Sequence, residues 1–216
     1  NPMWNQKDFK QYQEDDQFGR FLYGVTNNSS ADWGWIQHML ASLEDDGRMG
    51  IVLDQGALFR GGVEGKIRKA VLEEDLIECV IALPQKLFYN TGAPGCLIFL
   101  NKEKPKKRKD KVLFIYATEG STKLSNMNQL QPEHIEQIVI KFQEYTDSDK
   151  YSRVVDITEI DENEYNLSVT RYVDIFDPPE PIDIQLVWNE LKQLEKQRTE
   201  TTAKLETYLK ELGYEN

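Results

Sequence analysis

The stretch MGIVLDQGALFRGGVEGKIRKAVLEEDLIECVIAL, residues 49–83, contains the order of elements that decides the fold. A short apolar run at 49–53 opens it, and a longer apolar run at 76–83 closes it. Strands that are apolar throughout, on either side of a helix, are typical of a sheet covered by helices on both faces. The stretch therefore predicts a strand, a helix and a second strand of an α/β sheet. The helix is indicated by apolar residues at helical spacing after a Gly-Gly pair: Val63, Ile67, Ala70 and Val71.

Two more apolar runs follow, at 96–100 and at 112–117. The loop at 85–94 is too short for a helical crossover, so the strands on either side of it are expected to be antiparallel. The predicted fold class is α/β, a partial doubly wound sheet with an antiparallel edge. These strands are too few to complete such a sheet, so we expect the others in chain that precedes Asn1.

Helical periodicity also appears in the residues that lead to Gly47 and again after Pro132. Residues 151–176 are mixed, with short extended pieces expected around Val154 and Tyr172. We interpret residues 1–176 as one domain.

Prolines at 178, 179 and 181 separate this domain from a C-terminal segment at 182–216. Residues 182–214 follow a heptad pattern, which favours packing on a partner helix. Packing on the chain's own domain is the alternative. One heptad position reads Ile184, Leu191, Arg198, Leu205 and Leu212, and its companion reads Val187, Leu194, Thr201 and Tyr208.

The charge balance limits how the chain can bind nucleic acid. It has 26 Lys and Arg against 37 Asp and Glu, a net charge of −11. Nucleic-acid affinity depends largely on neutralising phosphates, so a chain this acidic needs another subunit, or another part of its protein, to hold DNA. The basic run at 102–111 is interpreted as a solvated connection between strands, with a nucleic-acid patch as the alternative.

Composition also bears on location and on metal sites. No stretch approaches the ~20 apolar residues of a membrane helix, and the N-terminus has no signal-peptide pattern, so we expect a cytoplasmic protein without a membrane contact. Cys79 and Cys96 lie in apolar runs without a ligand or partner at metal or disulfide spacing, which favours buried thiols in a reducing cytosol. His38 and His134 also lack ligand-spaced partners, so no metal site is predicted.

The tetrapeptide Asn1-Pro2-Met3-Trp4 offers the groups that an amino-bearing nucleobase needs. The Asn1 side chain and the Pro2 carbonyl can each accept a hydrogen bond from an exocyclic amine, and Trp4 can stack on a planar ring. An adenine swung out of its duplex fits such a pocket. Taken alone, the tetrapeptide is more typical of a turn followed by a core aromatic residue.

A loop after the second strand carries further candidates for a base pocket. Phe88, Tyr89, Asn90 and Thr91 follow that strand closely and combine aromatic and hydrogen-bonding side chains. They are interpreted as substrate-binding residues, with a plain turn as the alternative.

Several stretches together resemble the C-terminal half of the modification (methyltransferase) subunit of type I restriction–modification enzymes. The resemblance implies an S-adenosylmethionine-dependent methyltransferase that acts on the N6 amino group of adenine in DNA. It also implies that Asn1, Pro2 and Trp4 form the catalytic motif. The matching stretches are NPMW at 1–4, ADWGWIQHMLASL at 31–43, most of 47–94, KVLFIYA at 111–117 and YNLSVTRYV at 165–173.

Some features depart from the family pattern. The family usually has Asn-Pro-Pro followed by Phe or Tyr, where this chain has Met3 and Trp4. Asp54 stands where the family often has proline, which would place a carboxylate near the mouth of the site. The Gly-rich turn that binds the cofactor is not seen, so we expect its main contacts upstream of Asn1. The chain is expected to be the C-terminal part of a longer protein and inactive alone.

The resemblance further implies DNA as substrate, with its target sequence read by a separate subunit. Specificity and restriction subunits are the implied partners, docking through residues 182–214. The alternative function is a non-catalytic assembly module that docks these subunits. A third hypothesis is a protein-glutamine or RNA methyltransferase, which the long central match and the C-terminal heptads disfavour.

Overall fold

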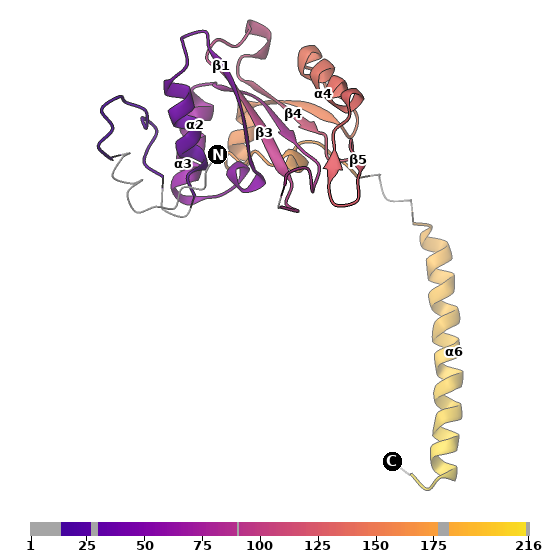
Figure 1. Ribbon diagram of the computed structural model, residues 1–216. Coiled ribbons are helices and arrows are strands. Elements are labelled where there is room, and N and C mark those ends of the chain that lie inside the picture. The colour runs from indigo at the N-terminus through magenta and orange to yellow at the C-terminus, as the bar shows by residue number, and fades with distance from the viewer. Residues whose placement is uncertain (1–13, 27–29, 90, 177–181, 215–216) are drawn as a thin grey trace. The chain divides into compact units, whose positions relative to one another are not determined.

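Five strands form the main sheet of the structure, a computed structural model that describes residues 14–26, 30–89, 91–176 and 182–214 (Figure 1). Their order across the sheet is β1-β3-β2-β4-β7. The four apolar runs of the sequence are strands β1 to β4, as predicted. The bounds are β1 (Arg48–Asp54), β2 (Ile77–Ala82), β3 (Gly95–Asn101), β4 (Lys111–Tyr116) and β7 (Ser152–Asp156).

Strand β3 lies between β1 and β2 and is antiparallel to both. The predicted antiparallel pairing across the 85–94 loop is confirmed, with Val80 opposite Ile98. Strands β2 and β4 are parallel, and β7 is the antiparallel partner of β4. The α/β prediction is confirmed, but β3 is an interior strand, and the edge strand β7 contains the residues around Val154 that were expected to be extended.

Helices cover both faces of the sheet (Figure 1). Helices α2 (Asp32–Ala41) and α3 (Gly62–Glu73) pack on one face, where Trp33, Ile36 and Ile67 have no exposed surface. Helix α4 (Pro132–Glu144) packs on the other face, where the Phe142 ring lies 5.3 Å from that of Phe99 between centroids. The helices at these three places were predicted from periodicity.

Strands β1 and β2 differ in burial although both are apolar in sequence. Every residue of β2 is buried, whereas β1 alternates, with Met49, Ile51 and Leu53 buried and Val52 41% exposed. On the first face, α2 contacts β1. On the second face, α4 contacts β4, which is separated from β1 by β3 and β2 in the strand order. The prediction that both strands are buried on both faces is therefore wrong for β1 in the described part of the chain.

The segment after β7 contains helix α5 (Ile157–Glu162) and the 3-10 helix η3 (Val169–Arg171). Tyr172 was expected to be extended, but it directly follows η3. Its ring stacks on Phe114 of β4, 4.3 Å between centroids, and its hydroxyl donates to the Asn166 carbonyl. Because η3 turns the chain back, the Tyr172 ring reaches the sheet. The prediction of an extended piece around Tyr172 is therefore wrong.

The basic run between β3 and β4 is partly internal to the domain. Lys104 is 4% exposed, and its Nζ donates to the carbonyls of Ile77 at 3.1 Å and Lys111 at 2.7 Å and pairs with Asp75. Burial lowers the pKa of Lys104. The interpretation as a solvated connection is therefore wrong for Lys104. It holds for Lys107, in the 3-10 helix η2 (Lys106–Arg108), which is exposed.

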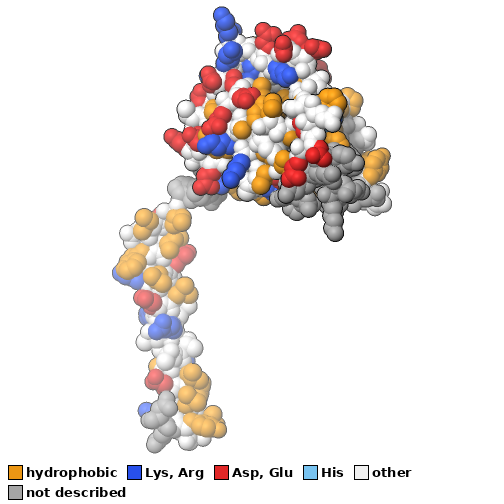
Figure 2. All heavy atoms as spheres, turned by 90° about the vertical axis from the view of Figure 1, so that its left-hand side faces the viewer, with side chains coloured by type: hydrophobic (Ala, Val, Ile, Leu, Met, Phe, Trp, Pro, Cys, Tyr) orange, Lys and Arg blue, Asp and Glu red, His pale blue; other side chains and the backbone are white. Residues whose placement is uncertain are grey.

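The chain divides into two compact units, Asn1–Phe176 and Asp177–Asn216, and the second contains helix α6 (Ile184–Glu211). Asp183 caps this helix by accepting from the backbone N–H groups of Gln185 at 2.9 Å and Leu186 at 3.1 Å. Figure 2 shows apolar side chains gathered near both ends of α6, with charged side chains between them. Among the described residues, no helix is both long and apolar enough to span a membrane.

Candidate active site

The predicted catalytic motif lies outside the described residues. Asn1, Pro2 and Trp4 fall within residues 1–13, and Asn90 of the predicted base-binding loop is outside as well. Their roles stay predictions. The structure describes the rest of that loop, the hairpin beside it and the turn after β1.

The described residues of the loop after β2 have different environments. The Phe88 ring packs into the core of the second face and fills the space over Gly95, where a Cβ atom would approach Phe88 Cε2 to 2.5 Å. The Thr91 hydroxyl accepts from the Ala93 backbone N–H at 3.1 Å. Tyr89, by contrast, is 83% exposed. Phe88 and Thr91 thus hold the shape of the loop, and Tyr89 is available to stack on a planar ring.

A small antiparallel hairpin, β5 (Thr122–Lys123) and β6 (Asn128–Gln129), holds the start of this loop. The backbone N–H of Asn128 donates to the Lys86 carbonyl at 2.8 Å, and its side-chain Nδ2 donates to the Gln85 carbonyl at 2.7 Å. Asn128 therefore fixes two consecutive residues just before Phe88. Asn128 was not predicted from the sequence, because two-residue strands carry no periodicity.

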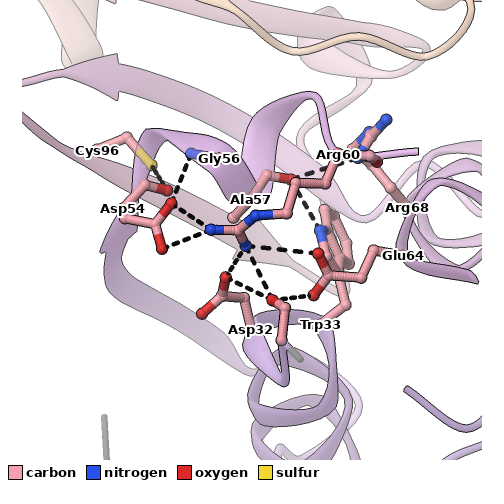
Figure 3. Close-up of polar contacts among 10 residues, drawn as sticks. Asp32, Trp33, Asp54, Gly56, Ala57, Arg60, Glu64, Arg68 and Cys96 are labelled. Carbon is pink, nitrogen blue, oxygen red and sulfur yellow. Dashed lines mark hydrogen bonds and ion pairs between the residues drawn. The ribbon is translucent and has the colours of Figure 1, made fainter. Parts of the chain in front are cut away.

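Arg60 lies at the centre of a cluster of carboxylates at the end of β1 (Figure 3). Its Nη2 atom contacts both carboxylate oxygens of Asp54, at 2.6 and 2.8 Å. Its Nη1 atom contacts Asp32, the Ser30 hydroxyl at 2.9 Å and Glu64 at 3.5 Å. We call these five residues the Arg60 cluster. It joins segments that are far apart in sequence: the start of α2, the end of β1 and the first turn of α3.

The cluster decides what Asp54 does. Asp54 also accepts from the Gly56 backbone N–H at 2.6 Å, which caps the 3-10 helix η1 (Gln55–Leu58). Burial opposes the charge on Arg60, but the hydrogen bonds that Arg60 donates to Asp54 and Asp32 outweigh this effect and raise the pKa of Arg60. The expected carboxylate is thus present at the end of β1, but it is engaged in an ion pair and a helix cap. An arginine at the start of a helix can bind an anion, but here carboxylates already surround Arg60, which disfavours that role.

Arg68 holds the turn after β1 from inside the domain. It is 3% exposed, and it donates from Nε to the Tyr165 carbonyl at 2.7 Å and from Nη1 to the Arg60 carbonyl at 2.8 Å. Trp33 donates from Nε1 to the Ala57 carbonyl at 2.9 Å. Burial lowers the pKa of Arg68 to about 10. Arg68 was not predicted from the sequence, although a charged residue on the apolar side of a predicted helix was the available signal.

A cleft of about 770 Å³ lies at the carboxyl ends of β1, β2 and β4. Lys123 and Asn128 of the hairpin line one part of it, and residues 168–170 around η3 line another. Gln85 and Pro94, at the two ends of the predicted base-binding loop, also line it. We call it the strand-end cleft.

The lining of the strand-end cleft is polar but nearly free of charge. Most of its residues are Ser, Thr, Asn, Gln or Tyr, and its charged members are Lys123 and Glu119. Thr118 belongs to this lining, and its hydroxyl oxygen is buried with no hydrogen-bond partner among the described residues. Such unsatisfied groups are uncommon in native proteins, so each calls for an explanation.

The described residues do not fit the cofactor that the family resemblance implies. Binding its adenosyl group in this kind of fold needs a Gly-rich turn between strand and helix and an acidic residue for the ribose. After β1 the turn is η1, closed by the Arg60 cluster, and after β2 and β4 the chain enters loops that lead to further strands. The described residues also contain no group of three or more His, Cys, Asp or Glu that could hold a metal ion.

Comparison with known proteins adds to this geometry. The family model for N-6 DNA methylases matches residues 1–180. The chain is 41% identical, over 99% of its length, to the type I restriction enzyme MjaVIII methylase subunit of Methanocaldococcus jannaschii. It is 32% identical, over its whole length, to the HindI methylase subunit of Haemophilus influenzae.

Solved structures agree in fold. The methyltransferase subunit of a type I restriction–modification system from Streptococcus thermophilus superposes on 81% of this chain, with a TM-score of 0.72 and 38% identity. The EcoKI M protein superposes on 73% of it at 16% identity, with a TM-score of 0.57, and shows the fold alone. The chain spans 38% of the MjaVIII subunit, 51% of the HindI subunit and 36% of the Streptococcus thermophilus chain.

Proposed function

The chain belongs to the N-6 DNA methylase family, among the methylase subunits of type I restriction enzymes, and we propose that it supplies the base-binding part of such a subunit. In the complete subunit, a methyl group passes from S-adenosylmethionine to the N6 amino group of adenine in DNA. The family match over residues 1–180, which includes the Asn-Pro-Met-Trp motif, is the observation that supports this most. The described residues do not fit the cofactor and the chain spans 38% of the MjaVIII subunit, so we propose that other parts of such a subunit hold the cofactor and that the chain alone is inactive.

The chemical task of this chain is to prepare the amine. An exocyclic aromatic amine is a weak nucleophile, because its lone pair is delocalised into the ring. The Asn1 side-chain oxygen and the Pro2 carbonyl accept the two N–H groups, which favours a tetrahedral nitrogen with a localised lone pair. Trp4 stacks on the adenine, and the exposed ring of Tyr89 offers a second stacking face at the loop that Phe88 and Thr91 shape. Asn90 keeps its predicted role of binding the base.

The test is Asn1→Ala in the complete subunit, assembled with its partner subunits. Transfer of a radiolabelled methyl group to DNA should fall by roughly two to four orders of magnitude, by analogy with removal of one oxyanion-hole group. Trp4→Ala should weaken retention of the flipped base by about 1–3 kcal/mol. Asn126→Ala, an exposed asparagine in the β5–β6 turn, is the control and should methylate normally. Near-normal turnover by Asn1→Ala would show that the motif is misassigned.

Helix α6 is the part that we assign to assembly, with residues 182–214 docking the specificity and restriction subunits. Its heptad residues form an apolar stripe, with Ile184 80%, Leu194 62% and Leu212 72% exposed. Within the described part of its own compact unit, α6 has no second element on which to pack. A stripe of this kind favours burial against a partner helix.

The test of assembly is the double substitution Leu191→Asp with Leu205→Asp. Burying a Leu side chain contributes roughly 1.5–3 kcal/mol, so the complete subunit should no longer co-purify with its specificity partner. Gln193→Asp with Thr207→Asp adds the same charge at heptad positions off the stripe and should leave co-purification unchanged. Wild-type stoichiometry in the Leu double variant would place the docking surface elsewhere, and unfolding of the subunit would make α6 part of its core.

A further inference from the structure

We propose that the strand-end cleft binds the sugar–phosphate backbone of DNA next to the target nucleotide. In this proposal Lys123 neutralises a phosphate, and the hydroxyls of Thr118 and Thr170 donate to phosphate or sugar oxygens. The inference rests on the proposed function, and it extends that function from the flipped base to the strand that carries the base.

The position of the cleft is the first argument. In open α/β sheets, ligands bind beyond the carboxyl ends of the strands, and the cleft lies there for β1, β2 and β4. Gln85 and Pro94 line it and are also the two ends of the predicted base-binding loop. A nucleotide whose base entered that loop would therefore lead its backbone along the cleft.

The chemistry of the lining is the second argument. Ser, Thr, Asn, Gln and Tyr, together with Lys and Arg, supply most protein contacts to phosphate and sugar, and these types predominate in the cleft. The chain as a whole has a net charge of −11, but the described lining of the cleft contains one carboxylate, Glu119, and the charge of Lys123 offsets it. The lining is thus a locally neutral surface for a polyanion. A docked protein would instead favour an apolar, aromatic interface core.

The Thr118 hydroxyl is the third argument. Thr118 lines the cleft, and its hydroxyl oxygen is buried with no hydrogen-bond partner among the described residues. Its position is fixed, because the preceding residue, Ala117, donates its backbone N–H to the Ala82 carbonyl at 3.0 Å and so joins the ends of β2 and β4. A phosphate or sugar oxygen in the cleft would give this hydroxyl its missing partner.

The experiment uses the complete methylase subunit assembled with its partner subunits. Dissociation constants for a duplex carrying the target site are measured by fluorescence anisotropy across a salt series, alongside KM and kcat for methylation. Lys123→Ala should raise Kd roughly five- to tenfold near 0.1 M salt and lower the slope of log K against log salt by about 1, as expected for one lost phosphate contact. Lys107 is an exposed lysine before the amino end of β4. Lys107→Ala removes the same charge and should change neither Kd nor the salt slope.

Thr118→Val separates binding from folding. It replaces the unsatisfied hydroxyl with a methyl group of similar size, so a purely structural hydroxyl predicts equal or higher stability and unchanged DNA binding. The proposal predicts a raised Kd and KM for DNA in a protein that is no less stable. Thr170→Val should act in the same direction.

The outcomes distinguish the two levels of inference. If the wild-type complex methylates DNA but Lys123→Ala and Thr118→Val bind it like wild type, the cleft proposal is wrong and the proposed function stands. If the wild-type complex binds DNA without methylating it, the proposed function fails, and the Kd values still decide the cleft proposal. If the variants bind DNA normally but lose a partner subunit, the cleft holds protein and the proposal is overturned.

Discussion

The Arg60 cluster and the strand-end cleft both lie where strands of the sheet end, yet they use polar groups in opposite ways. In the cluster, Arg60 contacts Asp32, Asp54 and Glu64, so the charges satisfy one another. In the cleft, charge is sparse, and the Thr118 hydroxyl has no partner among the described residues. The difference teaches that the density of charge is a poor guide to a binding site. Polar groups left unsatisfied by the fold are more informative.

The largest expected effect comes from breaking the cluster with Arg60→Met. The carboxylates of Glu64, 2% exposed, and Asp32, 19% exposed, would lose their cation, so the free energy of unfolding should fall by about 2–4 kcal/mol. The partial exposure of Arg60 keeps the loss toward the lower end. Urea unfolding of the complete subunit measures it, with Lys66→Met on the exposed side of α3 as the control for loss of one charge. Unchanged stability with weakened DNA binding would reverse the comparison and make the cluster the ligand site.

Asn128→Ala sharpens the comparison at the wall of the cleft. It removes the side-chain hydrogen bond to the Gln85 carbonyl at 2.7 Å, so the base-binding loop should lose its fixed position. We expect kcat for DNA methylation to fall roughly ten- to hundredfold, because small misplacements of reacting groups are costly, with little change in stability. Asn128→Asp, which keeps the size but loses the donor, should behave like Asn128→Ala, and Asn126→Ala should not. A large loss of stability with normal kcat would make Asn128 a structural residue alone.

The smallest expected effect concerns a hydroxyl that the fold does satisfy. Tyr172→Phe removes the hydrogen bond to the Asn166 carbonyl and should cost about 1 kcal/mol of stability, with DNA binding unchanged. Tyr89→Phe, at an exposed position, should leave stability unaltered.

The same variant carries a pH signature. Burial raises the pKa of Tyr172 to about 12, from the ordinary value of 10. Above pH 10 the unfolded chain releases this proton while the folded chain retains it, so the contribution of Tyr172 to stability is complete below pH 10 and is lost as the pH rises toward about 12. The stability difference between wild type and Tyr172→Phe should therefore shrink over that interval. A constant difference would show that the phenol titrates alike in both states.

Much of the fold was predictable because periodicity and apolar runs report on local burial. The runs that became β1 to β4 and the periodic segments that became α3, α4 and α6 needed no knowledge of distant contacts. The place of β3 between β1 and β2 was not predictable in the same way, since the order of strands depends on which edges meet in space. The prediction of an extended piece around Tyr172 was wrong for a related reason, because the turn before Tyr172 is set by stacking of its ring on Phe114.

The site was less predictable than the fold. Lys104 is buried because three acceptors surround it, two from residues 75–77 and one from Lys111, and nothing local in a run of lysines marks it. The Arg60 cluster likewise draws its members from positions 30 to 64, so Asp54 looked like a group at the mouth of a site. Thr118 is notable because its hydroxyl has no hydrogen-bond partner among the described residues, and a sequence does not show which groups lack partners. The motif at 1–4 was identified from sequence alone and remains a prediction.

The contact between Phe88 and Gly95 has a consequence for how this protein can change over generations. The ring occupies the place where any side chain at position 95 would begin, with Phe88 Cε2 only 2.5 Å from the site of a Cβ atom. A mutation at 95 by itself would push the ring out and drag the loop with it, whereas a smaller residue at 88 would first open room. The order of the two steps is therefore constrained: position 88 must shrink before position 95 can grow. Libraries that vary the base-binding loop should accordingly randomise both positions together.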